Sequence, residues 1–389
     1  MHFVGRVQSD RLTALLRSFP AVLLVGPRQS GKSTMARQAL PEWTHLDLER
    51  QLDFNALALD IEGFLEANPR ELAIDEAQRM PELFPALRHR IDQGHGRGRF
   101  LLLGSASPAL MRKVSESLAG RVAVLELTPF LASELAGTRR AAERWFWGGF
   151  PPVHALKERR ARTEWLAAYV ATLLERDLPA LGVGLPSRRL LTLWTMLTHV
   201  HGNLLNVSDL ARSLGVSSHT VTGDLDVLEG AFMIRRLPPY FANVQKRLTK
   251  SCKLYVRDTG ILHHLAGLRR PQELATWARR GASFEGLVIE ELAALASNRL
   301  VRPELFFWRT QAGAEVDLLI LEGRKILPIE IKLGASVDRY GFAGLRQCMK
   351  DLNLRRGWVV STSTDARTLA DGVDLVPWSK IIAGEVDFF

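Results

Sequence analysis

The stretch 22-VLLVGPRQSGKST-34 decides how the first part of this chain folds. An apolar run leads into a turn that contains Gly26 and Gly31, and Lys32 and Ser33 open a segment with helical periodicity. Glycines at this spacing let backbone N–H groups face a phosphate, while the lysine reaches the terminal phosphates and the serine hydroxyl ligates Mg²⁺. We therefore predict a loop that binds ATP and Mg²⁺, made of Gly26, Pro27, Arg28, Gln29, Ser30, Gly31, Lys32, Ser33 and Thr34.

An acidic pair ends the next motif, 72-LAIDEAQRMP-81. Asp75 is predicted to hold Mg²⁺ through water, and Glu76 to polarise the attacking water while Lys32 offsets charge on the phosphates. A third apolar run, 100-FLLLGSAS-107, ends in small hydroxyl residues, and Ser105 is the candidate for a polar contact to the γ-phosphate. The sequence therefore predicts hydrolysis of ATP as well as its binding.

Arginines beyond this third run could complete the nucleotide site. Arg121 is either an arginine finger that acts in trans on the nucleotide of a neighbouring copy or a surface arginine. The first alternative predicts a homo-oligomer, with a hexamer as the expected form. A second arginine that contacts the γ-phosphate has three candidates, Arg159, Arg160 and Arg176.

The middle of the chain is basic and contains a helix–turn–helix pattern. Residues 151–270 hold 17 Lys and Arg against 9 Asp and Glu, so this part carries nearly all of the net charge of +9. Such an excess favours a polyanionic partner, although an arginine-rich surface is the alternative. A helix over 207–214 ends at Gly215, Ser217 and Ser218 cap a second helix that runs to about Glu229, and two strand-like runs follow. This order predicts a winged helix-turn-helix.

The expected partner of this element is duplex or branched DNA, bound without sequence specificity. Three acidic residues of the second helix, Asp224, Asp226 and Glu229, would repel phosphate, so a protein-binding module is the alternative. The residues predicted to face the groove are His219, Thr220 and Thr222, and those predicted to contact phosphates from the wing are Arg235, Arg236, Lys246, Arg247 and Lys250.

The last third contains a nuclease-like pattern, in which Asp317 precedes 330-EIK-332 by 13 residues on the next predicted strand. Asp317 and Glu330 are predicted to hold Mg²⁺ or Mn²⁺, and Lys332 to orient or deprotonate the water that attacks a phosphodiester. Glu285 is predicted to add a further carboxylate, with Glu290 as the second choice. The alternatives are a solvated strand face without chemistry, or a nuclease-like fold that is used only for binding.

The remaining composition indicates a cytoplasmic protein without a membrane partner. Two cysteines, Cys252 and Cys348, cannot build a disulfide framework and favour a reducing compartment. No secretory signal follows Met1, and no apolar run approaches the roughly 18–20 residues that a transmembrane helix needs.

The motifs taken in order resemble a bacterial and archaeal family of AAA-superfamily ATPases that carry a C-terminal domain of unknown function. The resemblance covers essentially the whole chain and implies an α/β fold: an AAA+-type P-loop core with a parallel sheet and flanking helices (1–150), a helical linker (151–190), a winged helix-turn-helix (191–270) and a PD-(D/E)xK, or restriction-endonuclease-like, α/β domain (271–389). The stretches that carry it are the ATP-binding loop, 74-IDEAQ-78, 104-GSASP-108, 118-LAGRV-122, 126-ELTPF-130 and 148-GGFP-151.

Two classes of function follow from these predictions. The first is a Mg²⁺-dependent ATPase that binds, remodels or branch-migrates DNA, with or without phosphodiester cleavage by the C-terminal domain. The second is a regulatory NTPase switch that binds a protein partner, in which the winged helix and the nuclease-like fold are not catalytic. DNA-stimulated hydrolysis of ATP and salt-sensitive binding distinguish the first class from the second.

Overall fold

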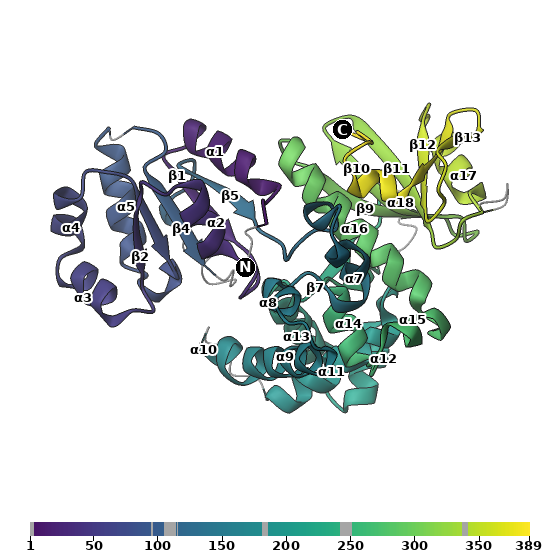
Figure 1. Cartoon of the computed structure of the whole chain (residues 1–389), viewed down its shortest axis with the longest axis horizontal. Coiled ribbons are helices and arrows are strands. Elements are labelled where there is room, and N and C mark those ends of the chain that lie inside the picture. The colour runs from purple at the N-terminus through teal and green to yellow at the C-terminus, as the bar shows by residue number, and fades with distance from the viewer. Residues whose placement is uncertain are drawn as a thin grey trace.

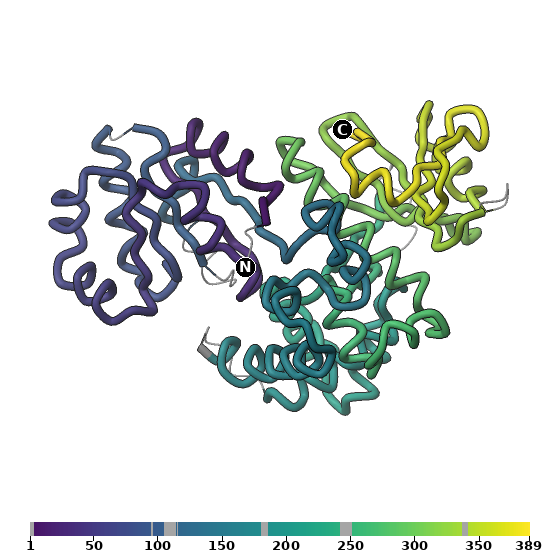
Figure 2. The backbone as a smooth tube through the Cα atoms, viewed as in Figure 1, coloured from purple at the N-terminus to yellow at the C-terminus, as the bar shows by residue number. Residues whose placement is uncertain are grey.

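The computed structural model of the chain describes residues 4–94, 96–104, 114, 116–180, 186–241, 251–336 and 341–389. They form an α/β molecule with a parallel sheet near the N-terminus, a group of helices in the middle and a mixed sheet near the C-terminus (Figure 1). Figure 2 shows the two sheets at opposite ends of the long axis, with the helical middle beside both. Across the described ranges, no helix is long and apolar enough to span a membrane.

The N-terminal sheet is buried on both faces. Val22 and Leu24 of its central strand pack against two helices, α1 (Gln8–Ser18) and α2 (Lys32–Ala39). Leu23 points to the opposite face, because successive side chains of a strand alternate between faces. That face is covered by α3 (Gln51–Leu59), α4 (Ile61–Ala67) and α5 (Leu83–Asp92). The five parallel strands in sheet order are β2 (Thr44–Asp47), β3 (Leu72–Asp75), β4 (Phe100–Gly104), β1 (Ala21–Val25) and β5 (Val122–Glu126).

The middle part has one hydrophobic core, which includes Phe146, Trp194, Leu225 and Leu274. The predicted linker helices therefore pack together with the helix–turn–helix pair. A small antiparallel sheet has the order β6 (Asn203–Leu204), β8 (Lys253–Val256) and β7 (Ile234–Leu237). The helices are α7 (Arg139–Trp147), α8 (Pro151–Ala155), α9 (Arg159–Thr172), the π-helix η3 (Leu173–Asp177), α10 (Leu178–Ala180), α11 (Ser187–Val200), α12 (Val207–Leu214), α13 (Ser218–Gly230), α14 (Thr259–Leu265) and α15 (Pro271–Thr276).

The pair α12 and α13 has clear local causes in the sequence. Asn206 caps α12 by accepting from the backbone N–H groups of Ser208 and Asp209. Gly215 ends α12 in the left-handed region with φ 66°, which glycine adopts without steric cost. Ser217 then caps α13 by accepting from the backbone N–H of Thr220.

The C-terminal sheet is mixed, and a helix packs on each of its faces. Leu292 of the long helix α16 (Arg280–Arg299) packs with Leu318 and Ile329 on one face, and Leu345 of α17 (Ala343–Asp351) packs with Leu319 on the other. The strands in sheet order are β13 (Arg367–Ala370), β14 (Val373–Pro377), β12 (Gly357–Ser361), β11 (Lys325–Lys332), β10 (Glu315–Glu322) and β9 (Glu304–Arg309), and the short helix α18 (Trp378–Ile382) follows them.

Candidate functional site

The predicted ATP-binding loop connects β1 to α2, and its glycines are required by its shape. Gly26 has φ 152°, and a Cβ atom there would lie 2.2 Å from the carbonyl oxygen of Leu127. Gly31 has φ 98° and directly precedes α2. Lys32 follows it, and its Nζ donates to the carbonyl oxygens of Gly26 at 3.0 Å and Pro27 at 2.9 Å. Burial lowers the pKa of Lys32.

The acidic pair lies at the same edge of the sheet as this loop, because β1 and β3 are parallel and flank β4. The hydroxyl of Ser33 donates to the carboxylate of Asp75, at the end of β3. The next residue, Glu76, has φ 52°, an uncommon conformation for a residue with a side chain. Burial raises the pKa of Glu76, and the amide of Gln78 donates to its carboxylate.

The loop and the acidic pair line a cavity of about 500 Å³, and residues of the middle part of the chain line it as well. Arg28 of the loop forms ion pairs with Asp177 of η3 and, at 2.5 Å, with Glu49. Arg176 pairs with the same Asp177 at 3.1 Å. The lining residues are Arg28, Gln29, Gly31, Lys32, Ser33, Thr34, Glu49, Asp75, Glu76, Pro151, Pro152, Arg176 and Asp177.

Of the three arginines considered for the γ-phosphate, the structure places only Arg176 among the residues that line this cavity. Arg159 is exposed at the start of α9, and Arg160 pairs with Glu164 one turn further along that helix at 2.7 Å. The hydroxyl of Ser33 and the carboxylate of Asp75 supply hard oxygen ligands side by side, so the described residues fit Mg²⁺ here.

Sequence reasoning missed Arg6, which lies behind the loop. Its side chain is buried and donates to the carbonyl oxygens of Ser30 at 2.9 Å and Thr128 at 2.5 Å. Glu134 accepts from Arg6 Nε at 3.0 Å and also from the backbone N–H groups of Val7 and Leu131. Nothing in the sequence around Arg6 marks it, because its partners lie more than 20 residues away.

Arg121 does not lie at the cavity of its own chain. It precedes β5, at the edge of the sheet opposite the loop, and a five-residue strand separates the two edges by roughly 13 Å. Its guanidinium makes two hydrogen bonds to Asp92 of α5, at 2.7 and 2.9 Å. A role in trans therefore stays a prediction, as does the contact predicted for Ser105, which lies outside the described residues.

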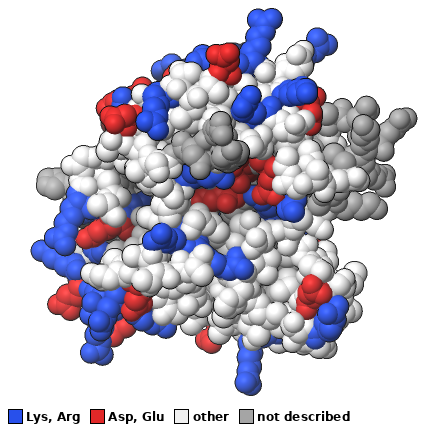
Figure 3. All heavy atoms as spheres, turned by 90° about the vertical axis from the view of Figure 1, so that its right-hand side faces the viewer, with Lys and Arg blue, Asp and Glu red and all other residues white. Residues whose placement is uncertain are grey.

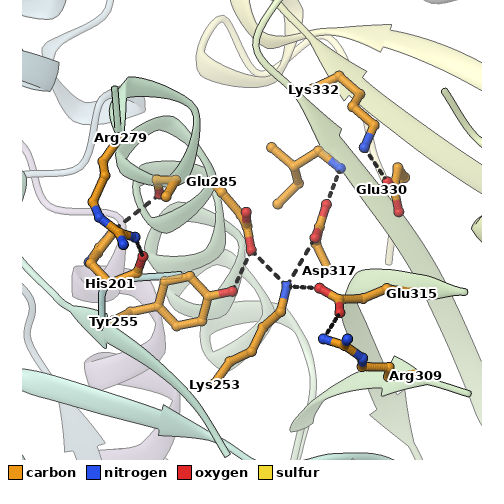
Figure 4. A network of polar contacts seen from close by, with 12 residues as sticks. His201, Lys253, Tyr255, Arg279, Glu285, Arg309, Glu315, Asp317, Glu330 and Lys332 are labelled. Atoms are coloured by element: carbon orange, nitrogen blue, oxygen red, sulfur yellow. Dashed lines mark hydrogen bonds and ion pairs between the residues drawn. The ribbon is translucent and has the colours of Figure 1, made fainter. Parts of the chain in front are cut away.

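Asp317, Glu330 and Lys332 lie on adjacent strands of the C-terminal sheet (Figure 4). Asp317 Oδ2 accepts from the backbone N–H of Ile331 at 2.9 Å, which fixes its carboxylate against β11. Lys332 Nζ lies 2.5 Å from Glu330 Oε1. Burial raises the pKa of Glu330 to about 8.

Glu285 of α16, the carboxylate predicted from a helix, also lies near Asp317. A lysine that the sequence did not predict, Lys253, lies between these two carboxylates. Lys253 Nζ lies 3.1 Å from Glu285 Oε1, 3.2 Å from Asp317 Oδ1 and 2.5 Å from Glu315 Oε1. Burial alone would lower the pKa of Lys253, but these carboxylates outweigh it and hold that pKa well above its ordinary value. Burial likewise raises the pKa of Glu285 to about 7.

The metal site predicted from Asp317, Glu330 and Glu285 therefore does not fit this geometry. Glu285 and Asp317 share an ammonium group, and Glu330 is paired with Lys332. Over the ranges that the structure describes, no three His, Cys, Asp or Glu side chains are grouped so that they could hold a metal ion. Spacing along two strands could not reveal this, because the lysine comes from a distant part of the chain.

Glu290, the second choice for that site, belongs to a different network. It accepts from Arg235 at 2.5 and 3.0 Å and from Arg257 at 2.8 Å, and Arg257 also pairs with Glu126 at the end of β5. This hub of four charged residues, Glu126, Arg235, Arg257 and Glu290, connects the N-terminal sheet, the small middle sheet and α16. Burial disfavours the charge of Glu290, but the two arginines lower its pKa to about 2.

Two of the arginines predicted to contact DNA phosphates form ion pairs with carboxylates of the chain itself. Arg235 is committed to Glu290, and Arg236 pairs with Glu229 and with Asp226 at 2.7 Å. Two of the acids expected to repel phosphate are thus compensated from within the chain. Asp224, the third, is buried and paired with Arg189 at 2.9 Å.

The groove-facing residues lie on α13, with His219 and Thr222 exposed and Thr220 half-buried. Lys246, Arg247 and Lys250 lie outside the described residues. Figure 3 shows Lys and Arg interspersed with Asp and Glu over one face of the molecule, without a continuous basic stripe.

Three family models match successive parts of the chain. An AAA domain matches residues 18–136, a domain of unknown function (DUF8612) matches 138–272, and a second domain of unknown function (DUF4143) matches 280–381. The uncharacterized proteins Rv2008c of Mycobacterium tuberculosis and Mb2031c of Mycobacterium bovis are each 41% identical over 388 residues, which cover 98% of this chain and 86% of the relative.

A solved Walker-type ATPase of Pyrococcus abyssi shares 16% identity, with a TM-score of 0.49 over 68% of this chain and 96% of that one. The match to the mycobacterial proteins over 98% of this chain and the order of the matched domains agree with the resemblance in the motifs. The chain belongs to the family of AAA-superfamily ATPases that carry a C-terminal domain of unknown function.

Proposed function

We propose that this protein hydrolyses ATP in a Mg²⁺-dependent reaction at the cavity between the loop and η3. One observation carries the proposal: Lys32, Ser33, Asp75 and Glu76 converge on a single cavity of about 500 Å³. They are the groups that ATP hydrolysis requires, namely a cation for the phosphates, two oxygen ligands for a metal ion and a carboxylate for the attacking water.

Each of these residues has a defined task. The backbone N–H groups at the start of α2 and the ammonium of Lys32 bind the β- and γ-phosphates. Ser33 and Asp75 would hold Mg²⁺, which neutralises charge on the phosphates when bound. Glu76 orients a water molecule toward the γ-phosphate, and its raised pKa makes it a stronger proton acceptor than an exposed carboxylate.

The ion pairs of Asp177 offer a route from the nucleotide to the middle part of the chain. Arg28 and Arg176 both pair with Asp177, and all three residues line the cavity. The γ-phosphate of ATP carries more charge than a carboxylate and competes with Asp177 for these arginines. We propose that this exchange alters the contact between η3 and the loop when ATP binds and when it is hydrolysed.

We further propose that DNA, duplex or branched, is the partner of the middle part. The support is the basic composition of residues 151–270, the helix–turn–helix geometry of α12 and α13, and the internal compensation of Asp226 and Glu229 by Arg236. Binding would then depend on the exposed residues His219 and Thr222 and on the basic segment 246–250, and less on Arg235 and Arg236 than the sequence predicted.

One observation favours a second candidate, a nucleotide-dependent switch that binds a protein. The predicted nuclease residues Asp317 and Glu285 are joined to Lys253, and two of the predicted phosphate contacts, Arg235 and Arg236, are paired inside the chain. In this case the C-terminal domain would act as a docking module without phosphodiesterase activity.

Steady-state ATPase assays with and without duplex, single-stranded and forked DNA separate the two candidates. For a DNA-acting ATPase, we expect DNA to raise the hydrolysis rate, and added salt to suppress that increase. Replacing Lys246, Arg247 and Lys250 by glutamine should abolish the stimulation and leave the DNA-free rate unchanged. A rate indifferent to every DNA would support the protein switch.

A further inference from the structure

We infer that Lys253 is the resident cation of the C-terminal carboxylate cluster, in the position where a nuclease-like fold would hold Mg²⁺ or Mn²⁺. The cluster consists of Glu285, Glu315, Asp317 and Glu330 (Figure 4). This inference does not rest on the proposed hydrolysis of ATP, because the cluster lies in the C-terminal domain and shares no residue with the nucleotide cavity.

The ammonium of Lys253 is enclosed by its partners. Lys253 is 2% exposed, and its Nζ contacts one oxygen from each of Glu285, Glu315 and Asp317 at 2.5–3.2 Å. Phe307 lies below it, with the ring centre 5.8 Å from Nζ. Three carboxylates around one buried ammonium satisfy the three hydrogen-bond donors that a lysine possesses.

Most of the carboxylate oxygens that a metal ion would need are already used. Asp317 gives one oxygen to Lys253 and the other to the backbone N–H of Ile331. Glu285 Oε1 accepts from both Lys253 and the hydroxyl of Tyr255. Glu330 Oε1 is paired with Lys332, which leaves Glu330 Oε2 as the cluster's one buried oxygen without a partner among the described residues. Glu330 Oε2 and Glu285 Oε2 are then the two carboxylate oxygens of the cluster without a partner among the described residues, and the buried ammonium of Lys253 beside Glu285 would repel a divalent cation there.

Lys253 comes from the small middle sheet and not from the C-terminal domain, which indicates a structural role for the cluster. Lys253 and Tyr255 lie two residues apart on β8, so both point toward Glu285 from the small middle sheet. The cluster thus attaches that sheet to the C-terminal domain through charge instead of building a catalytic centre. Removing the lysine would leave Glu285 and Asp317 without a counter-ion, because among the described residues only Glu315 has a second ion-pair partner, Arg309 at 3.0 Å, and a divalent cation would relieve that state.

The test measures Mn²⁺ binding to the nucleotide-free full-length chain by electron paramagnetic resonance, comparing the wild type with Asp317→Asn. We expect no difference, because the wild-type cluster holds no metal. Bound Mn²⁺ that disappears in Asp317→Asn would overturn the inference. This comparison needs no change at Lys253 and decides the question even if a Lys253 variant does not fold.

The second arm replaces Lys253 by methionine, with Lys325→Met on the exposed start of β11 as the matched control. We expect Lys253→Met to bind Mn²⁺ about tenfold or more tightly than the wild type, to lose this gain when Asp317→Asn is added, and to melt on the order of 10 °C lower without metal. A folded Lys253→Met chain with unchanged melting temperature and no gain in Mn²⁺ affinity would refute the role of Lys253.

Discussion

Replacing Glu290 by glutamine is expected to lower the free energy of unfolding by about 3 kcal/mol at pH 7. Glu290 is 6% exposed and accepts hydrogen bonds from Arg235 and Arg257. Burial alone would raise its pKa, but the two arginines lower that pKa to about 2 from 4.5. Each tenfold change in an acid dissociation constant is worth about 1.4 kcal/mol, which gives the magnitude above.

The sign of the pH dependence follows from the direction of this shift. Because the pKa of Glu290 is lower in the folded than in the unfolded chain, its contribution is complete above pH 4.5 and is lost as the pH falls toward about 2. Glutamine cannot ionise, so the variant lacks the contribution at pH 7 and has a flatter stability profile over this acidic range.

Urea unfolding followed by tryptophan fluorescence measures the effect. The matched control is Glu304→Gln, an exposed carboxylate at the start of β9, which should change the free energy of unfolding by less than about 0.5 kcal/mol. Equal stability of Glu290→Gln and the wild type at pH 7 would refute the claim that this hub connects the three parts of the molecule.

Three further predictions concern the ATP-binding loop and a buried histidine. Arg6→Ala should lower kcat/KM for ATP on the order of 10²-fold, because the loop loses the guanidinium that donates to the carbonyl oxygen of Ser30. Steady-state kinetics of the wild type, Arg6→Ala and the conservative variant Arg6→Lys measure this loss. Asp177→Asn should strengthen ATP binding about three- to tenfold by removing the competitor for Arg28; calorimetry checks this, and unchanged affinity would contradict the exchange. Burial lowers the pKa of His201 to about 3 from 6.5, so the neutral ring contributes fully to the free energy of unfolding above pH 6.5 and loses this contribution as the pH falls toward 3. The free energy of unfolding should therefore fall by about 1.4 kcal/mol per pH unit below pH 6.5. Urea unfolding between pH 7.5 and 4.5 should show this slope, and His201→Gln should reduce it.

The ATP-binding loop and the acidic pair could be predicted from sequence because their residues act locally. The glycines of the loop, Lys32 and Ser33 are fixed by one turn between a strand and a helix, and Asp75 ends a strand that the apolar pattern already indicates. The family of the chain and its α/β class were likewise predicted and are confirmed by the matched domains and by the two sheets.

The parts that sequence could not reveal depend on contacts between distant segments. Arg6, Asp177 and Lys253 belong to no motif, yet each reaches the predicted residues from more than 20 positions away. Net charge was a poor guide to the middle part, because Arg235 is paired with Glu290, a carboxylate far away in the sequence, and Arg236 with Glu229 on the preceding helix. The composition gives the number of charged residues but not which of them are already paired within the folded chain.

The measurement that tests the central claim most directly compares ATP binding and ATP hydrolysis in Mg²⁺ for the wild type, Lys32→Ala and Glu76→Gln. We predict that the wild type binds and hydrolyses ATP, that Lys32→Ala loses both activities, and that Glu76→Gln binds ATP but hydrolyses it at least about 100-fold more slowly. Hydrolysis by Glu76→Gln at the wild-type rate, or by Lys32→Ala, would contradict the assignment of this cavity as the ATPase site.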